Sequence, residues 1–158
     1  MRRRSTKRMI GGDSALALAR VLLVDSNPAS RLILQAVLSA SGYWVDTAAS
    51  AAEAVLKLDE DEYELVLSDL QMESPEAGLK VIAHARIMPY KPAAALITAY
   101  HNSPQLNTQG PILIEPENLP ELLSKVAALI SERATRRIAR RLRRNPDGLG
   151  ARRTVLSN

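Results

Sequence analysis

The sequence predicts an α/β domain with a parallel β-sheet and helices on both of its faces. Two observations support this fold class: short apolar runs alternate with amphipathic segments between residues 20 and 145, and several apolar runs end in an acidic or hydroxyl residue. Helical right-handed crossovers between parallel strands place helices on both faces of the sheet. With 158 residues, the chain is long enough for one domain with short extensions.

The first elements are predicted near residue 20. Residues 20–25 form an apolar run that ends in an acid, which is typical of a strand buried on both faces. The Asn-Pro pair at 27–28 opens a predicted helix over 29–40, because proline is well placed in a first helical turn, and the Ser-Gly pair at 41–42 ends it. Residues 43–45 predict the second strand.

The middle of the chain predicts two helices around a third strand. Ser50 and Glu53 have the spacing of a capping box, which predicts a helix that runs to about Leu58. The apolar run that begins at Leu65 and ends at Asp69 predicts the third strand, and a helix led by glycine is predicted over 78–87.

Two more strands and a long helix complete the predicted elements. Pro92 precedes a fourth strand over 93–98, and 111–115 is the fifth. Pro120 begins a helix whose pattern continues to Asn145.

The charge is divided sharply along the chain. Residues 21–130 hold 6 basic and 14 acidic residues, a net charge of −8, whereas the flanks 1–20 and 131–158 hold 15 basic and 3 acidic residues, a net charge of +12. This division predicts three parts: a basic, disordered segment over 1–19, a folded domain over 20–131, and an arginine-rich helical extension and tail over 132–158.

Composition excludes several classes of protein. The chain contains no cysteine, so it has neither disulfides nor thiolate metal sites. No apolar run approaches the roughly 18 residues that a membrane span needs. The basic start, residues 1–8, is followed by an apolar stretch that Asp13 and Arg20 interrupt, so no export signal is expected and a cytoplasmic location is predicted.

Polar residues follow four of the predicted strands. Asp25 with Ser26, Asp69, Thr98 and Glu115 stand where the first, third, fourth and fifth strands end. Because the carboxyl ends of parallel strands meet at one edge of a sheet, three carboxylates and a hydroxyl should converge there. This group is the candidate functional site.

At these residues the chain resembles a response-regulator receiver domain of two-component (phosphorelay) signalling. The resemblance covers about residues 20–130 and rests on five segments in the right order: Val21–Pro28, Ala51–Ala54, Leu65–Met72, Leu96–Ala99 and Ile112–Pro116. It implies a flavodoxin-like, doubly wound sheet of five strands in the order 2-1-3-4-5.

The resemblance also implies roles for particular residues. Asp69 would attack a phosphoryl group and form an acyl phosphate, and Thr98 would hydrogen-bond the phosphoryl oxygens. Asp25, Asp69 and the backbone carbonyl of Gln71 would be oxygen ligands for Mg²⁺. A histidine kinase or phosphotransfer protein would be the partner, and the domain would be a signalling module and not an enzyme.

The chain departs from the family pattern at several positions. Ser26 replaces the second acid of the first strand's pair, which implies a weaker magnesium site and leaves open whether Ser26 is a ligand. Glu115 replaces the family lysine. The segment between Met72 and Gly78 is longer by a residue, and the polar stretch over 100–110 predicts a shortened or missing helix.

The replacement at Glu115 changes the charge of the site. Three acids and one lysine give a usual receiver site about −2, whereas Asp25, Asp69 and Glu115 without a lysine give about −3. Two unit charges ~4 Å apart at an effective dielectric of ~20 interact by about 4 kcal/mol, so the phosphorylated state should be weakened. Alternatively, Glu115 is a metal ligand that substitutes for the acid missing at Ser26.

Helical spacing continues beyond the domain. Apolar residues recur every four positions, and seven arginines cover most of the remaining surface; the apolar residues are Leu122, Val126, Ile130, Ala134, Ile138 and Leu142, and the arginines are 133, 136, 137, 140, 141, 143 and 144. The last three turns should project beyond the domain. Four interpretations stay open: a solvated tail, a nucleic-acid contact, a helix that forms a homodimer or binds a partner, and a contact with an anionic membrane surface.

Together these observations predict a stand-alone receiver with no attached output domain. It would either accept a phosphoryl group on Asp69 or act as a phosphorylation-independent interaction module. The alternative function is a nucleic-acid-binding adaptor, in which the arginine-rich helix binds and the receiver fold is only a scaffold.

Overall fold

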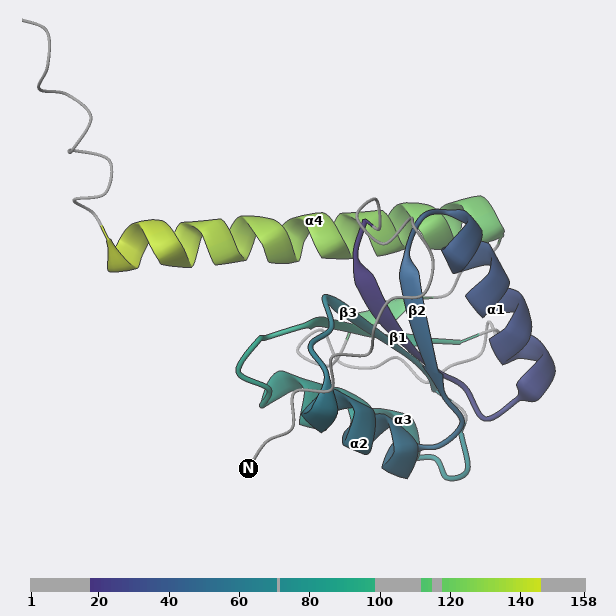
Figure 1. Cartoon of the computed structure of the whole chain (residues 1–158). Coiled ribbons are helices and arrows are strands. Elements are labelled where there is room, and N and C mark those ends of the chain that lie inside the picture. Colours follow the sequence, from purple (N-terminus) through teal and green to yellow (C-terminus); the bar gives the residue numbers. More distant parts are fainter. Residues whose placement is uncertain (1–17, 71, 99–111, 115–117, 146–158) are drawn as a thin grey trace, which may run out of the picture.

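The computed structural model describes residues 18–70, 72–98, 112–114 and 118–145. Strands and helices alternate from residue 20 to residue 97 as the sequence predicts, and a fifth strand and a long helix follow among the described residues after 111 (Figure 1). In chain order the elements are β1 (Arg20–Val24), α1 (Pro28–Ala40), β2 (Trp44–Ala48), α2 (Ala51–Glu60), β3 (Leu65–Asp69), α3 (Ala77–Arg86), β4 (Ala93–Ile97), β5 (Ile112–Ile114) and α4 (Leu119–Arg144).

The strands form one parallel sheet in the order β2-β1-β3-β4-β5. Val24 at the end of β1 is in register with Ala48 of β2 and Ser68 of β3, and Asp69 is in register with Ile97 of β4. The carboxyl ends of four strands are therefore aligned at one edge of the sheet. The predicted fold class and the doubly wound strand order are confirmed.

Helices cover both faces of the sheet. Successive residues of a strand point to opposite faces, so Leu23 and Leu67 pack with one set of helices while Leu22 and Val66 pack with the other. The first cluster includes Leu38 of α1 with Leu122 and Val126 of α4, and the second includes residues of α2 and α3. Figure 1 shows α2 and α3 together on one side and α4 on the other.

Side-chain caps begin three of the helices. Asn27 Oδ1 accepts hydrogen bonds from the N–H groups of Ala29 and Ser30 at 3.0 and 3.1 Å. Ser50 Oγ accepts from the N–H of Glu53 at 3.2 Å, as the capping box predicts, although the Glu53 carboxylate accepts from Ala49 N–H and not from Ser50 N–H. Asn118 caps α4 in the same way. These caps satisfy N–H groups that have no partner within the helix.

The buried face of α4 differs from the predicted apolar stripe. The buried residues are Leu122, Val126, Leu129 and Arg133, and every residue from 134 to 145 is exposed. A helix turns about 100° per residue, so a stripe that recurs every four residues rotates by about 40° at each step. Ile138 and Leu142 therefore lie opposite Leu122, and their exposed fractions are 59% and 50%.

The last part of α4 extends away from the sheet, as predicted (Figure 1). We call residues 134–145 the arginine segment. One expectation for this helix was wrong: Arg133 is buried and does not belong to the arginine-covered surface. Its guanidinium contacts the turn between α3 and β4, which a wheel drawn from the sequence alone does not show.

Several predictions fall on residues that the structure does not describe. They concern the basic start over 1–17, the polar stretch over 100–110 and the tail after residue 145. Among the described residues, no helix is both long and apolar enough to cross a membrane.

Candidate functional site

Asp25 is held at the carboxyl edge of the sheet by its position directly after β1. Its N–H donates to the carbonyl oxygen of Ala48 at 3.0 Å, which extends the pairing of β1 with β2 by one residue. Its Oδ1 atom accepts a hydrogen bond from the N–H of Asn27 at 2.9 Å, and the residue is 2% exposed. The tight turn into α1 thus determines where this carboxylate points.

A cation lies beside Asp25. Arg31, the fourth residue of α1, donates from Nη1 to the backbone carbonyl of Asp25 at 2.8 Å. No pattern in the sequence indicates this role of Arg31, because its reach back to the strand end depends on how α1 packs on the sheet. The guanidinium places positive charge next to the acidic edge.

Asp69 is the last residue of β3, next to β1 in the sheet. The N–H of Leu70 donates to the carbonyl oxygen of Ile97 at 2.9 Å, so the pairing with β4 continues past Asp69. A Cβ atom on Gly78 would lie 2.6 Å from the carbonyl oxygen of Asp69. Only glycine allows α3 to approach the end of β3 this closely, and Gly78 therefore helps to place the Asp69 backbone.

The two aspartates line one small cavity of about 70 Å³. Its other lining residues are Leu23, Val24, Ser30, Leu34 and Ile97. A cavity of this size has room for more than one water molecule, since one water needs ~10–15 Å³ on this measure. Two carboxylates with space for water suit Mg²⁺, which is commonly bound by one or two carboxylates and keeps several waters.

The described residues contain no cluster of three or more acidic or histidine side chains that could hold a metal ion. Asp25 and Asp69 are the two carboxylates among the described residues that line the cavity. Gln71 and Glu115, the other candidates from the sequence, lie outside the described residues. Whether Glu115 is a ligand or a source of repulsion stays a prediction.

The two hydroxyl candidates differ in exposure. Thr98 lies at the same edge of the sheet as the aspartates, because it follows β4 directly. Its side chain is buried, with 3% of the residue exposed. Ser26 is exposed beside the buried Asp25. The cavity lining includes neither of them.

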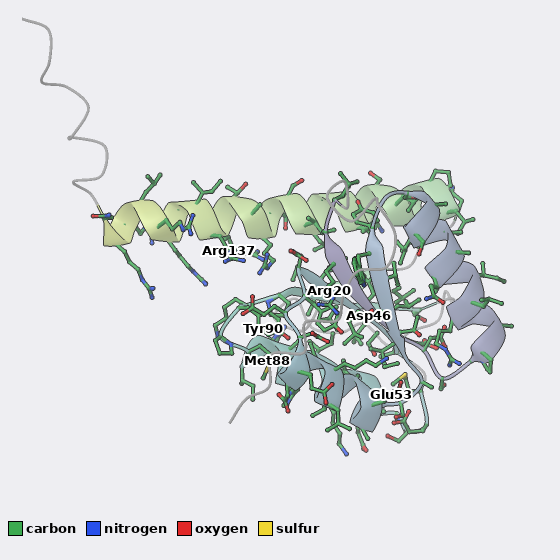
Figure 2. All side chains as sticks on the ribbon, in the orientation of Figure 1. Arg20, Asp46, Glu53, Met88, Tyr90 and Arg137 are labelled. Carbon is green, nitrogen blue, oxygen red and sulfur yellow. The ribbon has the colours of Figure 1, made fainter. Side chains whose placement is uncertain are left out.

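A second polar cluster, which no sequence motif predicts, lies toward the opposite edge of the sheet. Asp46 Oδ2 accepts from Arg20 Nη2 and from the Tyr63 hydroxyl, both at 2.8 Å, and Asp46 Oδ1 accepts from Trp44 Nε1 at 3.2 Å. The Arg20 guanidinium carbon lies 5.5 and 5.0 Å from the ring centres of Trp44 and Tyr63. Figure 2 shows Arg20 and Asp46 next to each other beneath α4.

Charge and burial set the pKa values in this second cluster. Burial alone raises the pKa of Asp46, but the hydrogen bonds from Tyr63 and Arg20 outweigh burial and hold the pKa below its usual value. Burial, together with the Asp46 carboxylate, raises the pKa of Tyr63. The tyrosine therefore stays a hydrogen-bond donor, and the cluster ties β1, β2 and the start of β3 together.

The chain is similar to known proteins over its first four strands and the helices between them. Residues 21–109, more than half of the chain, match the family of response regulator receiver domains. The transcriptional regulatory protein GlrR of Escherichia coli K12 is 34% identical over 87 residues, which are 54% of this chain and 19% of GlrR. The chain thus spans about a fifth of that relative's length.

Solved structures give the same result. The response regulator TrrA of Thermotoga maritima, in complex with Mg²⁺-BeF, is 33% identical with a TM-score of 0.60, and the match covers 70% of this chain and 97% of TrrA. TrrA in complex with the histidine kinase ThkA is 31% identical with a TM-score of 0.59 and the same coverage.

Proposed function

The chain belongs to the response regulator receiver domain family, and on that premise we propose that Asp69 accepts a phosphoryl group while Asp25 and Asp69 hold Mg²⁺. Receiver domains are modules of two-component signalling. In the proposed step, a carboxylate oxygen of Asp69 attacks phosphorus, the bond from phosphorus to the donor breaks, and the donor leaves with that electron pair. When bound, Mg²⁺ would neutralise charge on the phosphoryl oxygens.

One observation carries this proposal: Asp25 and Asp69 come from neighbouring strands and line the same cavity at the carboxyl edge of the sheet. Arg31 binds the Asp25 carbonyl and keeps a cation beside that edge. Thr98, buried at the end of β4, is the proposed hydrogen-bond donor to the phosphoryl group. The TrrA complex with Mg²⁺-BeF, at 33% identity, supports the same ligand chemistry.

The proposed donor is a histidine kinase or a phosphotransfer protein, which the complex of TrrA with ThkA supports. A phosphorylation-independent interaction module is the version of this function that would remain if Glu115 made the acidic site too negative for an acyl phosphate. A cytoplasmic location belongs to the same proposal. The nucleic-acid-binding adaptor is not favoured, since the family and the closely similar structures are signalling receivers.

Intact mass spectrometry tests the proposal. The protein is incubated with a small phosphodonor and Mg²⁺, and the expected result is an added phosphoryl mass that maps to Asp69. The adduct should be absent in Asp69→Asn and present in Glu73→Gln, a matched control in which an exposed carboxylate after β3 is removed. No adduct in the natural protein at saturating Mg²⁺ would leave only the phosphorylation-independent module, and an adduct on another residue would refute the role of Asp69.

A further inference from the structure

The arginine segment carries an unusual concentration of unpaired charge. It contains six arginines and no acidic residue, and all of its side chains are exposed. None of these arginines forms a salt bridge with another residue that the structure describes. The arginines are 136, 137, 140, 141, 143 and 144.

Three of the arginines continue the face of α4 that packs on the domain. At about 100° per residue, Arg137, Arg140 and Arg144 lie within about 40° of the buried Arg133, whereas Ile138 and Leu142 lie on the far side of the helix. Figure 2 shows Arg137 on the side of α4 that faces Tyr90. A molecule that contacts these arginines must therefore approach from the side where the domain itself lies.

The part of the domain nearest to the start of the arginine segment is negatively charged. Residues 59–64, the last two of α2 and the four that connect α2 to β3, include five acids and no basic residue, and we call them the acidic loop. Asp59 pairs with His84, and Asp61 with Arg20, but Glu60 and Glu62 form no ion pair or hydrogen bond with another described residue. Arg133 at the base of the arginine segment donates to the carbonyl oxygen of Tyr90, and the Tyr90 hydroxyl donates to the carbonyl oxygen of Leu58 near the end of α2, so the loop lies close to that base.

The acidic loop cannot neutralise the far arginines of its own chain. The helix rises about 1.5 Å per residue, so Arg140 and Arg144 lie about 10 and 16 Å beyond Arg133 along the axis. Among the described residues, no ion pair joins a carboxylate of the acidic loop to an arginine of the segment. The arginines at the end of the segment and the carboxylates of Glu60 and Glu62 are both left for another molecule.

We propose that the arginine segment of one copy of this chain binds the acidic loop of a second copy, and that the contact is reciprocal about a two-fold axis. A two-fold dimer uses the same surface on both copies, so each copy supplies one basic helix and one acidic loop. The positive charge of each arginine segment is then paired with the negative charge of the partner's acidic loop. The opposite electrostatic potentials also speed the encounter of the two copies.

The position of the acidic loop favours a second copy over nucleic acid. A phosphate backbone on the face of Arg137 and Arg140 would lie close to the five carboxylates of the acidic loop, and the repulsion between these negative charges opposes the contact. A second copy meets both charges with their opposites. The dimer does not depend on phosphorylation, so Asp69→Asn should dimerise like the natural chain, and failure of one proposal leaves the other standing.

Light scattering and sedimentation of the full chain test the dimer. At about 0.05 M salt the mass should be twice 17.2 kDa, and the dissociation constant should rise at least about tenfold at about 0.5 M salt, where screening is strong. Arg140→Glu with Arg144→Glu should give a monomer, as should Glu60→Arg with Glu62→Arg. An equimolar mixture of these two variants should dimerise again, because each helix then faces a loop of opposite charge.

The control places carboxylates on the far side of the same helix. Thr135→Glu with Ala139→Glu should leave the dimer intact, because these residues are exposed and face away from the acidic loop. A natural chain that stays monomeric at low salt, or a dimer that survives both reversals, would overturn the proposal. So would a mixture that stays monomeric, or a monomer that retards duplex DNA in a gel at low salt.

Discussion

Arg133 donates a hydrogen bond from Nη2 to the backbone carbonyl oxygen of Tyr90, 2.8 Å away. Its Nε atom donates to the carbonyl oxygen of Lys91 at 3.0 Å, so one guanidinium holds two successive carbonyls of the turn between α3 and β4. The Tyr90 hydroxyl in turn donates to the carbonyl of Leu58 at the end of α2. Because α4 leaves the domain directly after Arg133, these bonds set the direction in which the arginine segment projects.

Arg133→Met should destabilise the domain. The change keeps the apolar stem but removes two charge-assisted hydrogen bonds, and we expect a loss of about 2 kcal/mol in the free energy of unfolding. Urea unfolding followed by circular dichroism measures this loss. Arg136→Met, an exposed position on the same helix, is the control and should change stability by no more than about 0.5 kcal/mol. Equal effects at the two positions would contradict the role of Arg133.

Gly78→Ala should destabilise the domain although alanine is the better helix former. The added Cβ would lie 2.6 Å from the Asp69 carbonyl oxygen, so the backbone has to shift at a cost of about 1–3 kcal/mol. Ala83→Gly at an exposed position of α3 measures the propensity difference alone, about 1 kcal/mol. Thermal unfolding compares the three proteins, and a more stable Gly78→Ala protein would show that the close approach is unimportant.

Asp46→Asn should lower stability at neutral pH by about 2 kcal/mol, because the carboxylate accepts from Arg20 and Tyr63. The pKa of Asp46 is lower in the folded protein than in the unfolded chain. The stabilisation by the Asp46 carboxylate is therefore fully present at pH values above its pKa in the unfolded chain, about 3.9. It is lost as the pH falls through the lower pKa of the folded protein. Urea unfolding at several pH values should show the difference between the two proteins shrink below about pH 4. A constant difference would contradict this.

Asp25→Asn should weaken Mg²⁺ binding by about tenfold or more, because Mg²⁺ binds few protein ligands and each carboxylate matters. Mg²⁺ should raise the melting temperature of the natural chain, since a ligand that binds only the folded state stabilises it. The shift should be much smaller in Asp25→Asn and unchanged in Glu53→Gln, whose carboxylate accepts from the N–H of Ala49. A full shift in Asp25→Asn would exclude Asp25 as a ligand.

Glu115→Lys separates the two hypotheses about that residue. If Glu115 only repels the phosphoryl group, the lysine should raise the extent of labelling at Asp69 and prolong its retention. If Glu115 is a metal ligand, the same change should abolish Mg²⁺ binding. Magnesium titration and intact mass measure both quantities, and both hypotheses fail if neither quantity changes.

The local sequence pattern was sufficient to predict the order of the strands and helices. It also predicted that Asp25 and Asp69 lie at the same edge of the sheet. Apolar runs and caps are short-range signals, and parallel strands bring their carboxyl ends together whatever the details of packing. Asn27, for example, caps α1 through neighbouring N–H groups, which depend only on adjacent residues. The charge division along the sequence likewise separates an arginine-rich end of the chain from the acidic part that precedes it.

Only the tertiary structure decided which side chains meet across elements. Arg133 is buried because the turn after α3 offers it two carbonyls, and Asp46 is paired because Arg20 and Tyr63 arrive from two other segments. Gly78 is required because α3 comes close to the end of β3. These contacts join residues far apart in the chain, and their partners follow from how helices pack on the sheet, which spacing along one helix or strand does not encode.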